Sequence, residues 1–291
     1  MKPKWRIGLI GPGRLGRAMV GELCRRGLPP QALAGRTQEK VVALAQRYGL
    51  RFCPMTEIHQ TADLILLTVA DDALASLATA LSRSDGWQGK ILLHTSGALD
   101  SNVLQPLRDV GARVGSLHPL QSFAGEERIP PGTVFGVEGD QAAKEAAEAI
   151  GQFLGGETFA LPPGYKALYH AGACIAANFL VTITVLAGEL FAAAGLAKEK
   201  VPAALLPLVE NVVKNMGKLG PAQALTGPVS RGDAQTILRH IKALNDTRPD
   251  LLPLYLELSR RTLELAQANG LPAERVKAVE EILVRSNLEM E

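Results

Sequence analysis

Two patterns in the sequence predict an α/β protein with a doubly wound, mainly parallel sheet, followed by an all-helical domain. Through the first half of the 291-residue chain, short β-branched or leucine-rich runs alternate with helical patterns, as is typical of βαβ units. After the Pro/Gly cluster Leu161–Gly164, strand patterns stop and helical spacing continues to the C-terminus. The predicted domains are therefore residues 1–162, which hold the sheet, and residues 163–291, which are helical.

Each predicted strand is a short apolar run, and each predicted helix has apolar residues on one face. The expected strands are Arg6–Ile10, Gln31–Ala34, Leu64–Val69, Lys90–His94, Arg113–Leu117 and Val134–Glu138. The expected helices of the first domain are Leu15–Arg26, Gln38–Tyr48 and Asp72–Ser82. Those of the second domain are Tyr165–Ala194, Lys198–Lys218, Asp233–Asn245, Leu251–Asn269 and Pro272–Asn287.

The composition is that of a globular protein, with 47% hydrophobic and 21% charged residues and a net charge of +2. No basic run is interleaved with aromatic residues, so nucleic acid is not an expected partner. Cys24, Cys53 and Cys174 show neither C-x-x-C spacing nor a zinc pattern, and no metal is expected. The N-terminal residues read as a first strand rather than a signal peptide, which favours the cytoplasm.

The segment Ala171–Gly188 carries no charged residue and approaches the length of a membrane span. It is rich in Ala, Gly and Thr, contains Asn178, ends at Glu189 and lacks an aromatic belt and a lysine-rich flank. We therefore predict a central core helix and no membrane contact. One small helical layer gives such a helix little cover, so we also predict a homodimer formed mainly by the helical domain.

The strongest motif is GPGRLG, which stands directly after an apolar strand and before an amphipathic helix. Gly11 permits a tight turn, Gly13 leaves room for a pyrophosphate, and Gly16 lets the helix pack close to the strand. The N–H groups at the helix start, including those near Arg14 and Leu15, then face the anion. The motif predicts a Rossmann-type dinucleotide site.

The second strand ends in Ala34-Gly35-Arg36-Thr37, where an NAD enzyme usually places an acid for the ribose hydroxyls. Arg36 and Thr37 instead offer a guanidinium and a hydroxyl to a 2′-phosphate, and Arg14 is a possible second cation. We therefore expect NADP(H). The alternative for Arg36 is a solvated surface arginine.

Other strand ends should meet the same crevice at the carboxyl edge of the sheet. Val69, Ala70, Thr95 and Ser96 are predicted to contact the cofactor, Thr95 and Ser96 at the nicotinamide ribose or carboxamide. Beyond the next strand, His118 and Gln121 lie where substrate could meet the nicotinamide ring. The alternative for His118 is a histidine that fixes a loop by bonding to backbone.

These motifs, with Asp71-Asp72, HTSGAL, GSLHPLQSF, KALYHAGACIAANF and ALTGPVSRGDAQTI, closely resemble a group of Rossmann-like proteins with a C-terminal helical domain of unknown function. The resemblance runs from about Arg6 to the end of the chain. The larger superfamily is that of the 6-phosphogluconate dehydrogenase-like reductases. It includes ketopantoate reductase, pyrroline-5-carboxylate reductase, the β-hydroxyacid dehydrogenases and the deazaflavin-dependent NADP oxidoreductases.

The resemblance implies an acid/base pair at the start of the second domain. In β-hydroxyacid dehydrogenases and ketopantoate reductase, a lysine and an Asn about one turn later occupy the places matched here by Lys166 and His170. Their spacing puts both on one helical face, where they could reach a carbonyl oxygen opposite the nicotinamide. His in place of Asn departs from the family pattern. The alternative is a solvated lysine and a buried, satisfied histidine.

The segment from Thr226 to Asp233 is similar to the S-P-G-G-T-T helix entrance of pyrroline-5-carboxylate reductase, with extra residues inserted. It sets Ser230 and Arg231 at a helix start, a natural place for a substrate carboxylate or phosphate. Ser230 or Asp233 could equally be an N-cap. Asn178 completes the predicted substrate residues.

Together these observations predict an NADP(H)-dependent oxidoreductase that transfers hydride to or from a small, anionic carbonyl or imine compound bound between the domains. The cofactor would supply hydride and the protein orientation and a proton donor. The alternative is a non-catalytic NADP(H)-binding sensor or assembly module, because a fold alone does not fix an activity.

Overall fold

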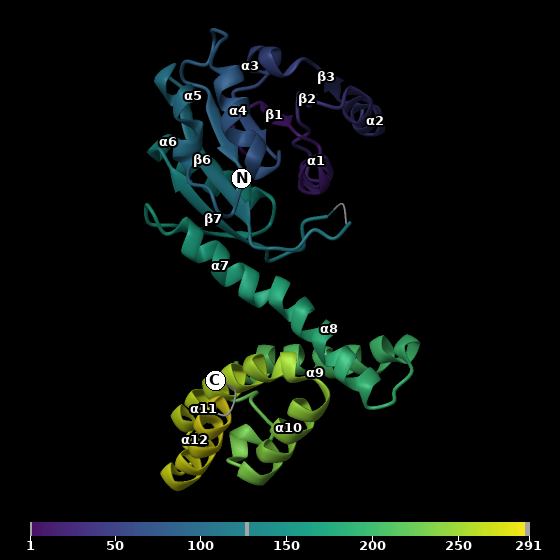
Figure 1. Cartoon of the computed structure of the whole chain (residues 1–291). Helices are drawn as coiled ribbons and strands as arrows, with labels where there is room; N and C mark the ends of the chain where they lie inside the picture. The colour runs from purple at the N-terminus through teal and green to yellow at the C-terminus, as the bar shows by residue number, and fades with distance from the viewer. Residues whose placement is uncertain (1, 126–127, 289–291) are drawn as a thin grey trace. The chain divides into compact units, whose positions relative to one another are not determined.

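An eight-stranded sheet organises the first half of the chain (Figure 1). The structure is a computed structural model that describes residues 2–125 and 128–288. The strand order is β3-β2-β1-β4-β5-β6-β7-β8, and neighbouring strands are parallel except for the antiparallel pair β6 and β7. The carboxyl ends of β1, β2, β4, β5 and β6 therefore share one edge. The strands are β1 (Ile7–Ile10), β2 (Ala32–Ala34), β3 (Arg51–Phe52), β4 (Leu64–Leu67), β5 (Ile91–His94), β6 (Arg113–Pro119), β7 (Val134–Gly139) and β8 (Glu157–Ala160).

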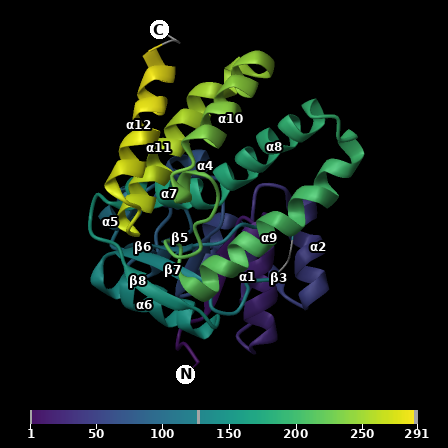
Figure 2. The same cartoon turned by 90° about the horizontal axis from the view of Figure 1, so that it is seen from below.

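Helices cover both faces of this sheet because its central strands are apolar on both sides. In β4, Leu66 joins a core with Leu23 and Ala147, whereas Ile65 joins a second core with Leu74. Helix α6 packs along β6, β7 and β8 (Figure 2). The predicted doubly wound, mainly parallel fold is confirmed. The helices of this part are α1 (Arg14–Arg25), α2 (Gln38–Tyr48), α3 (Ile58–Thr61), α4 (Asp71–Leu81), α5 (Gln105–Asp109), α6 (Gln141–Phe153) and α7 (Lys166–Ala176).

The chain divides into two compact units, one ending at Phe179 and the other beginning at Leu180. The second unit is helical, as predicted, and has its own apolar core around Ile237, Leu256 and Val279. The predicted boundary after residue 162 precedes α7, which belongs to the first unit. The remaining helices are α8 (Asn178–Ala193), α9 (Val201–Leu219), α10 (Ala234–Thr247), α11 (Leu252–Ala268) and α12 (Ala273–Leu288).

The prediction that Ala171–Gly188 is a buried core helix is wrong for the single chain. In α8, Val181 is 65% and Val185 is 56% exposed, and Gly188 is the buried position. Among the described residues, the helical stretch Lys166–Ala193 is long and apolar enough to cross a membrane, and 6% of its most apolar window is buried. A helix that is apolar on every side favours burial, but the surface that buries it need not belong to the same chain.

Candidate functional site

The glycines after β1 form a turn that needs glycine at defined positions. Gly11 has a φ of +94°, and a Cβ there would lie 2.6 Å from Val69 Cγ1. A Cβ on Gly16 would lie 2.5 Å from the Gly11 carbonyl oxygen, because the first turn of α1 packs against the loop. Thr68 Oγ1 donates to that same oxygen over 2.6 Å. The motif therefore has the predicted strand-turn-helix geometry.

Helix α1 begins without a side chain over its N-terminus. Gly13 is the N-cap residue and supplies no side-chain cap, and the nearest atom to a Cβ placed there would be 3.9 Å away. Arg14 opens the helix and is exposed, whereas Leu15 packs partly into the core. Unsatisfied N–H groups at a helix N-terminus bind anions. This cradle fits the pyrophosphate of a dinucleotide.

Arg36 and Thr37 are exposed beside this cradle. They follow β2, and the Gly11 N–H donates to the carbonyl oxygen of Ala34, the last residue of β2, over 2.9 Å. Thr37 is the N-cap residue of α2, but its hydroxyl makes no cap hydrogen bond. A guanidinium and a hydroxyl, with no acid in the segment 34–37, are suited to a 2′-phosphate.

The residues predicted to contact the cofactor at the ends of β4 and β5 also make hydrogen bonds and packing contacts within the protein. Thr95 Oγ1 donates to the carbonyl of the last β4 residue over 3.3 Å. Ser96 Oγ donates to Asp71 Oδ2 over 2.7 Å and accepts from backbone N–H groups two and three residues on. Val69 packs at the glycine turn, and Ala70 is the exposed N-cap residue of α4. These bonds hold the loop after β5 in one conformation.

His94, Ser116 and Glu138 form a buried polar row across β5, β6 and β7. The ammonium group of Lys166 reaches this row. Ser116 pairs with His94 on one side and with Glu138 on the other. Lys166 is 2% exposed, and its Nζ donates to Ser116 Oγ and lies 3.5 Å from Glu138 Oε1. Ser101 Oγ donates to Glu138 Oε2 over 2.9 Å. The row thus encloses one cation and one anion.

Burial dominates the ionisation of this row. Desolvation lowers the pKa of Lys166 to about 8, although Glu138 favours the charged form. Burial, with the charge of Lys166, lowers the pKa of His94 to about 3. The Ser116–Glu138 pairing places the Lys166 ammonium within the sheet, and the role of Lys166 and His170 beside a cofactor stays a prediction.

His118 on β6 and His170 on α7 lie close together. His118 Nδ1 lies 2.7 Å from the hydroxyl oxygen of Tyr169, and the His118 and His170 rings are nearly perpendicular, with centroids 5.9 Å apart. His170 Nε2 is 3.7 Å from Cys174 Sγ, and its Nδ1 is buried with no hydrogen-bond partner among the described residues. Two imidazoles therefore gather where β6 reaches the carboxyl edge.

The remaining predicted substrate residues are distributed over both units. Gln121 is exposed and its Oε1 accepts from the next N–H, and Asn178 is exposed at the start of α8. Ser230 Oγ donates to the Gly227 carbonyl over 2.9 Å, and Arg231 is exposed. Asp233, not Ser230, caps α10 by accepting from a backbone N–H over 3.1 Å.

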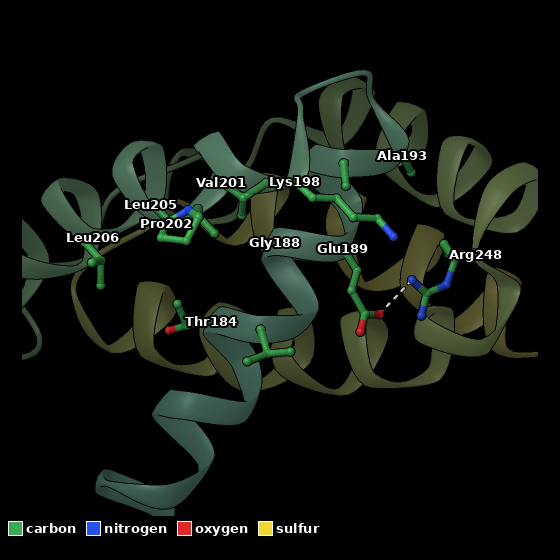
Figure 3. Close-up of a pocket in the computed structure, with 12 residues that line it drawn as sticks. Thr184, Gly188, Glu189, Ala193, Lys198, Val201, Pro202, Leu205, Leu206 and Arg248 are labelled. Atoms are coloured by element: carbon green, nitrogen blue, oxygen red, sulfur yellow. Dashed lines mark hydrogen bonds and ion pairs between the residues drawn. The ribbon is translucent and has the colours of Figure 1, made fainter. Parts of the chain in front are cut away.

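A separate apolar groove lies within the second unit (Figure 3). It has a volume of about 710 Å³ and runs between α8 and α9. Glu189 and Arg248 form an ion pair of 2.8 Å at one end, where Lys198 also lies. None of the predicted substrate residues lines it. Its walls include Val185, Gly188, Val201, Pro202, Leu205 and Leu206.

Three neighbours of the predicted residues escaped the sequence reasoning: Tyr169, Glu138 and Gly97. Tyr169 carried a usable signal, since it stands three residues after Lys166 on the same helical face. Glu138 and Gly97 carried none, because their roles depend on strand pairing and on the fold of the loop after β5.

Comparison with known proteins agrees with this architecture. Residues 1–119 match a Rossmann-like domain, and residues 133–262 match the domain of unknown function DUF2520. The chain therefore combines a Rossmann-like domain with a DUF2520 domain, which agrees with the resemblance that the motifs indicated. A search of curated proteins found no significant match.

Three solved structures share the fold. A protein from Thermotoga maritima is 26% identical, with a TM-score of 0.74 over 90% of this chain and 99% of that chain. A Bacteroides fragilis protein provisionally named an NADP oxidoreductase is also 26% identical, with a TM-score of 0.70 over 89% and 97%. A reductive aminase from Aspergillus terreus, solved with NADPH and ethyl levulinate, is 16% identical, with a TM-score of 0.62 over 99% and 95%. The prediction of NADP(H) agrees with the name of the Bacteroides fragilis protein and with the NADPH in the Aspergillus terreus structure.

Proposed function

We propose that the chain is an NADP(H)-dependent oxidoreductase that transfers hydride to or from a small, anionic carbonyl or imine compound. The observation that carries the proposal is the uncapped N-terminus of α1 behind the glycine turn, with exposed Arg36 and Thr37 beside it. Backbone N–H groups would hold the pyrophosphate, and Arg36 would hold the 2′-phosphate. The Bacteroides fragilis and Aspergillus terreus proteins support the choice of cofactor and reaction class.

The cofactor and the residues near the reacting atoms would have separate roles. Bound NADP(H) would supply or accept the hydride. His118 and His170, at the carboxyl edge of the sheet, would contact the substrate. Lys166 would act as a positioning residue and would not touch the substrate, because its Nζ is enclosed by Ser116 and Glu138. Ser230 and Arg231 remain candidates for the substrate anion.

Isothermal titration with NADPH and NADH tests the cofactor assignment. We expect NADPH to bind at least tenfold more tightly, a difference of about 1.4 kcal/mol. The variant Arg36→Ala should lose this preference, because a bidentate guanidinium bond to phosphate is lost. Arg83→Ala is the matched control, since it removes an exposed arginine after the C-terminal end of α4. Equal affinities in the wild type, or an unchanged preference in Arg36→Ala, would refute the assignment.

We further propose that the protein is a cytoplasmic homodimer that buries the apolar surface of α8. Phe179, Val181 and Val185 are each more than half exposed, and large apolar side chains gathered on one exposed helix indicate an interface. Cys24, Cys53 and Cys174 are free thiols, which suits a reducing compartment.

A further inference from the structure

The imidazole of His118 is engaged at one nitrogen and accessible at the other. Nδ1 contacts the Tyr169 hydroxyl over 2.7 Å, and the two rings meet edge to face with centroids 5.4 Å apart. In the described part of the chain, Nε2 has no hydrogen-bond partner and is not among the buried unpartnered atoms. Nε2 therefore keeps some exposed surface, whereas Nδ1 is occupied by the Tyr169 hydroxyl.

Two glycines make this arrangement possible. Gly136 is the cross-strand partner of His118, and a Cβ on it would lie 3.2 Å from the Tyr169 hydroxyl oxygen. The missing side chain leaves room for the phenol. A Cβ on Gly97 would lie 2.7 Å from His118 Nε2 and would also clash with His170 Nδ1. The loop that carries Gly97 is fixed by the Ser96 hydrogen bonds.

The environment keeps both partners neutral at neutral pH. Burial lowers the pKa of His118 to about 4, assisted by the charges of Lys166 and His170. Burial raises the pKa of Tyr169 to about 12. His94 on β5 and Glu138 on β7 are the other titratable groups in the adjoining row; Glu138 balances Lys166 there, and His94 is neutral.

The hydrogen-bond partners of Tyr169 and His118 then determine which tautomer His118 adopts. The Tyr169 hydroxyl has no other acceptor among the described residues, so donation to His118 Nδ1 satisfies it. A neutral imidazole that accepts at Nδ1 carries its proton on Nε2. The accessible nitrogen is thus an N–H donor.

We propose that Tyr169 is a positioning residue that fixes His118 as an Nε2–H donor, and that this N–H donates a hydrogen bond to the carbonyl oxygen of a ketone or aldehyde substrate. The inference rests on the proposed function and narrows it. A protonated imine presents only a donor, so it finds no acceptor at Nε2–H.

The hydrogen bond would strengthen as the reaction proceeds. Bound NADPH would supply the hydride for the new C–H bond and become NADP⁺, and the π electron pair of the carbonyl would move to oxygen. The Nε2–H group stabilises the developing oxyanion in the manner of an oxyanion-hole donor. The oxygen then takes its proton from water, and His118 keeps its own.

NMR of the full-length protein with ¹⁵N-labelled histidine tests the tautomer directly. Signals of His118 are assigned by their loss in His118→Gln. We expect protonation on Nε2 and no titration between pH 5 and 8. Tyr169→Phe should reduce the preference for this tautomer by about tenfold. Tyr255→Phe is the matched control, because it removes an equivalent phenol 2.9 Å from Nδ1 of the exposed His240 and should leave His118 unchanged.

Two probes with the same carbon skeleton test the substrate class in the presence of NADP⁺. Acetone, an acceptor, should shift the His118 Nε2–H resonance with dose, whereas isopropylammonium, a cationic donor, should not. A proton on Nδ1, titration near pH 6.5, no response to acetone or a response to isopropylammonium would each overturn the inference. The wild-type tautomer is read without Tyr169→Phe, so a folding defect in that variant would leave this result standing. NADPH titration separates the two proposals, because preferential NADPH binding with the wrong His118 tautomer leaves the proposed function intact.

Discussion

Replacing Lys166 with methionine should lower the free energy of unfolding by about 3 kcal/mol at pH 7. The substitution fills most of the space but leaves the Glu138 carboxylate buried without its cation. Breaking a buried ion pair from one side costs about 3–5 kcal/mol. We expect the lower end, because the Lys166–Glu138 separation of 3.5 Å is long and Glu138 keeps its bond from Ser101.

Urea unfolding followed by tryptophan fluorescence measures this loss. Trp87 is buried in the same unit and reports its unfolding. The double variant Lys166→Met/Glu138→Gln should recover at least half of the loss, since no buried charge is then unpaired. A single variant within 1 kcal/mol of the wild type would show that the ammonium does not neutralise Glu138, and the buried row would need another explanation.

Two further predictions follow from the same structure. The pKa of Lys166 falls from 10.5 to about 8 on folding, so between these pH values the unfolded chain binds more protons and stability should rise with pH. Pulse proteolysis across that range should show the rise in the wild type and not in Lys166→Met; parallel curves would contradict it. Light scattering at micromolar concentration should give twice the chain mass of 30.9 kDa, and Val181→Asp on α8 should give the monomer. A monomeric wild type would refute the proposed dimer.

The central strands could be predicted from sequence because their signals are local. Runs such as Leu64–Leu67 are apolar throughout, as strands buried on both faces must be. The strands β3 (Arg51–Phe52) and β8 (Glu157–Ala160) were missed, since both are short and mostly exposed edge strands with little apolar pattern. Helix α6 was missed although its buried face is alanine-rich, because alanine carries a weak hydrophobic signal.

The candidate site was predictable to the extent that one segment builds it. Gly11, Gly13 and Gly16 lie in a single turn, so their spacing and the strand and helix on either side indicated the dinucleotide cradle. The surroundings of Lys166 depend on strands β6 and β7, whose antiparallel register places Glu138 opposite Ser116. No local pattern records that register, and the helical spacing and the family resemblance indicated a lysine that faces the substrate, with a solvated lysine as the alternative. The cover of α8 is a similar case, because apolarity says how much surface needs burial but not which chain buries it.

The pairing of Gly136 with His118 provides a test for reading other sequences of this architecture. A chain with a side chain at the position of Gly136 has no room for a phenol beside its histidine, so its imidazole would be oriented by something else. Gly97, His118, Gly136 and Tyr169 therefore form a dispersed signature, brought together by the loop after β5, the β6–β7 pairing and the first turn of α7. Relatives that keep all four should present the same N–H donor to their substrates. Relatives that change Gly136 and Tyr169 together should have diverged in the compounds they accept.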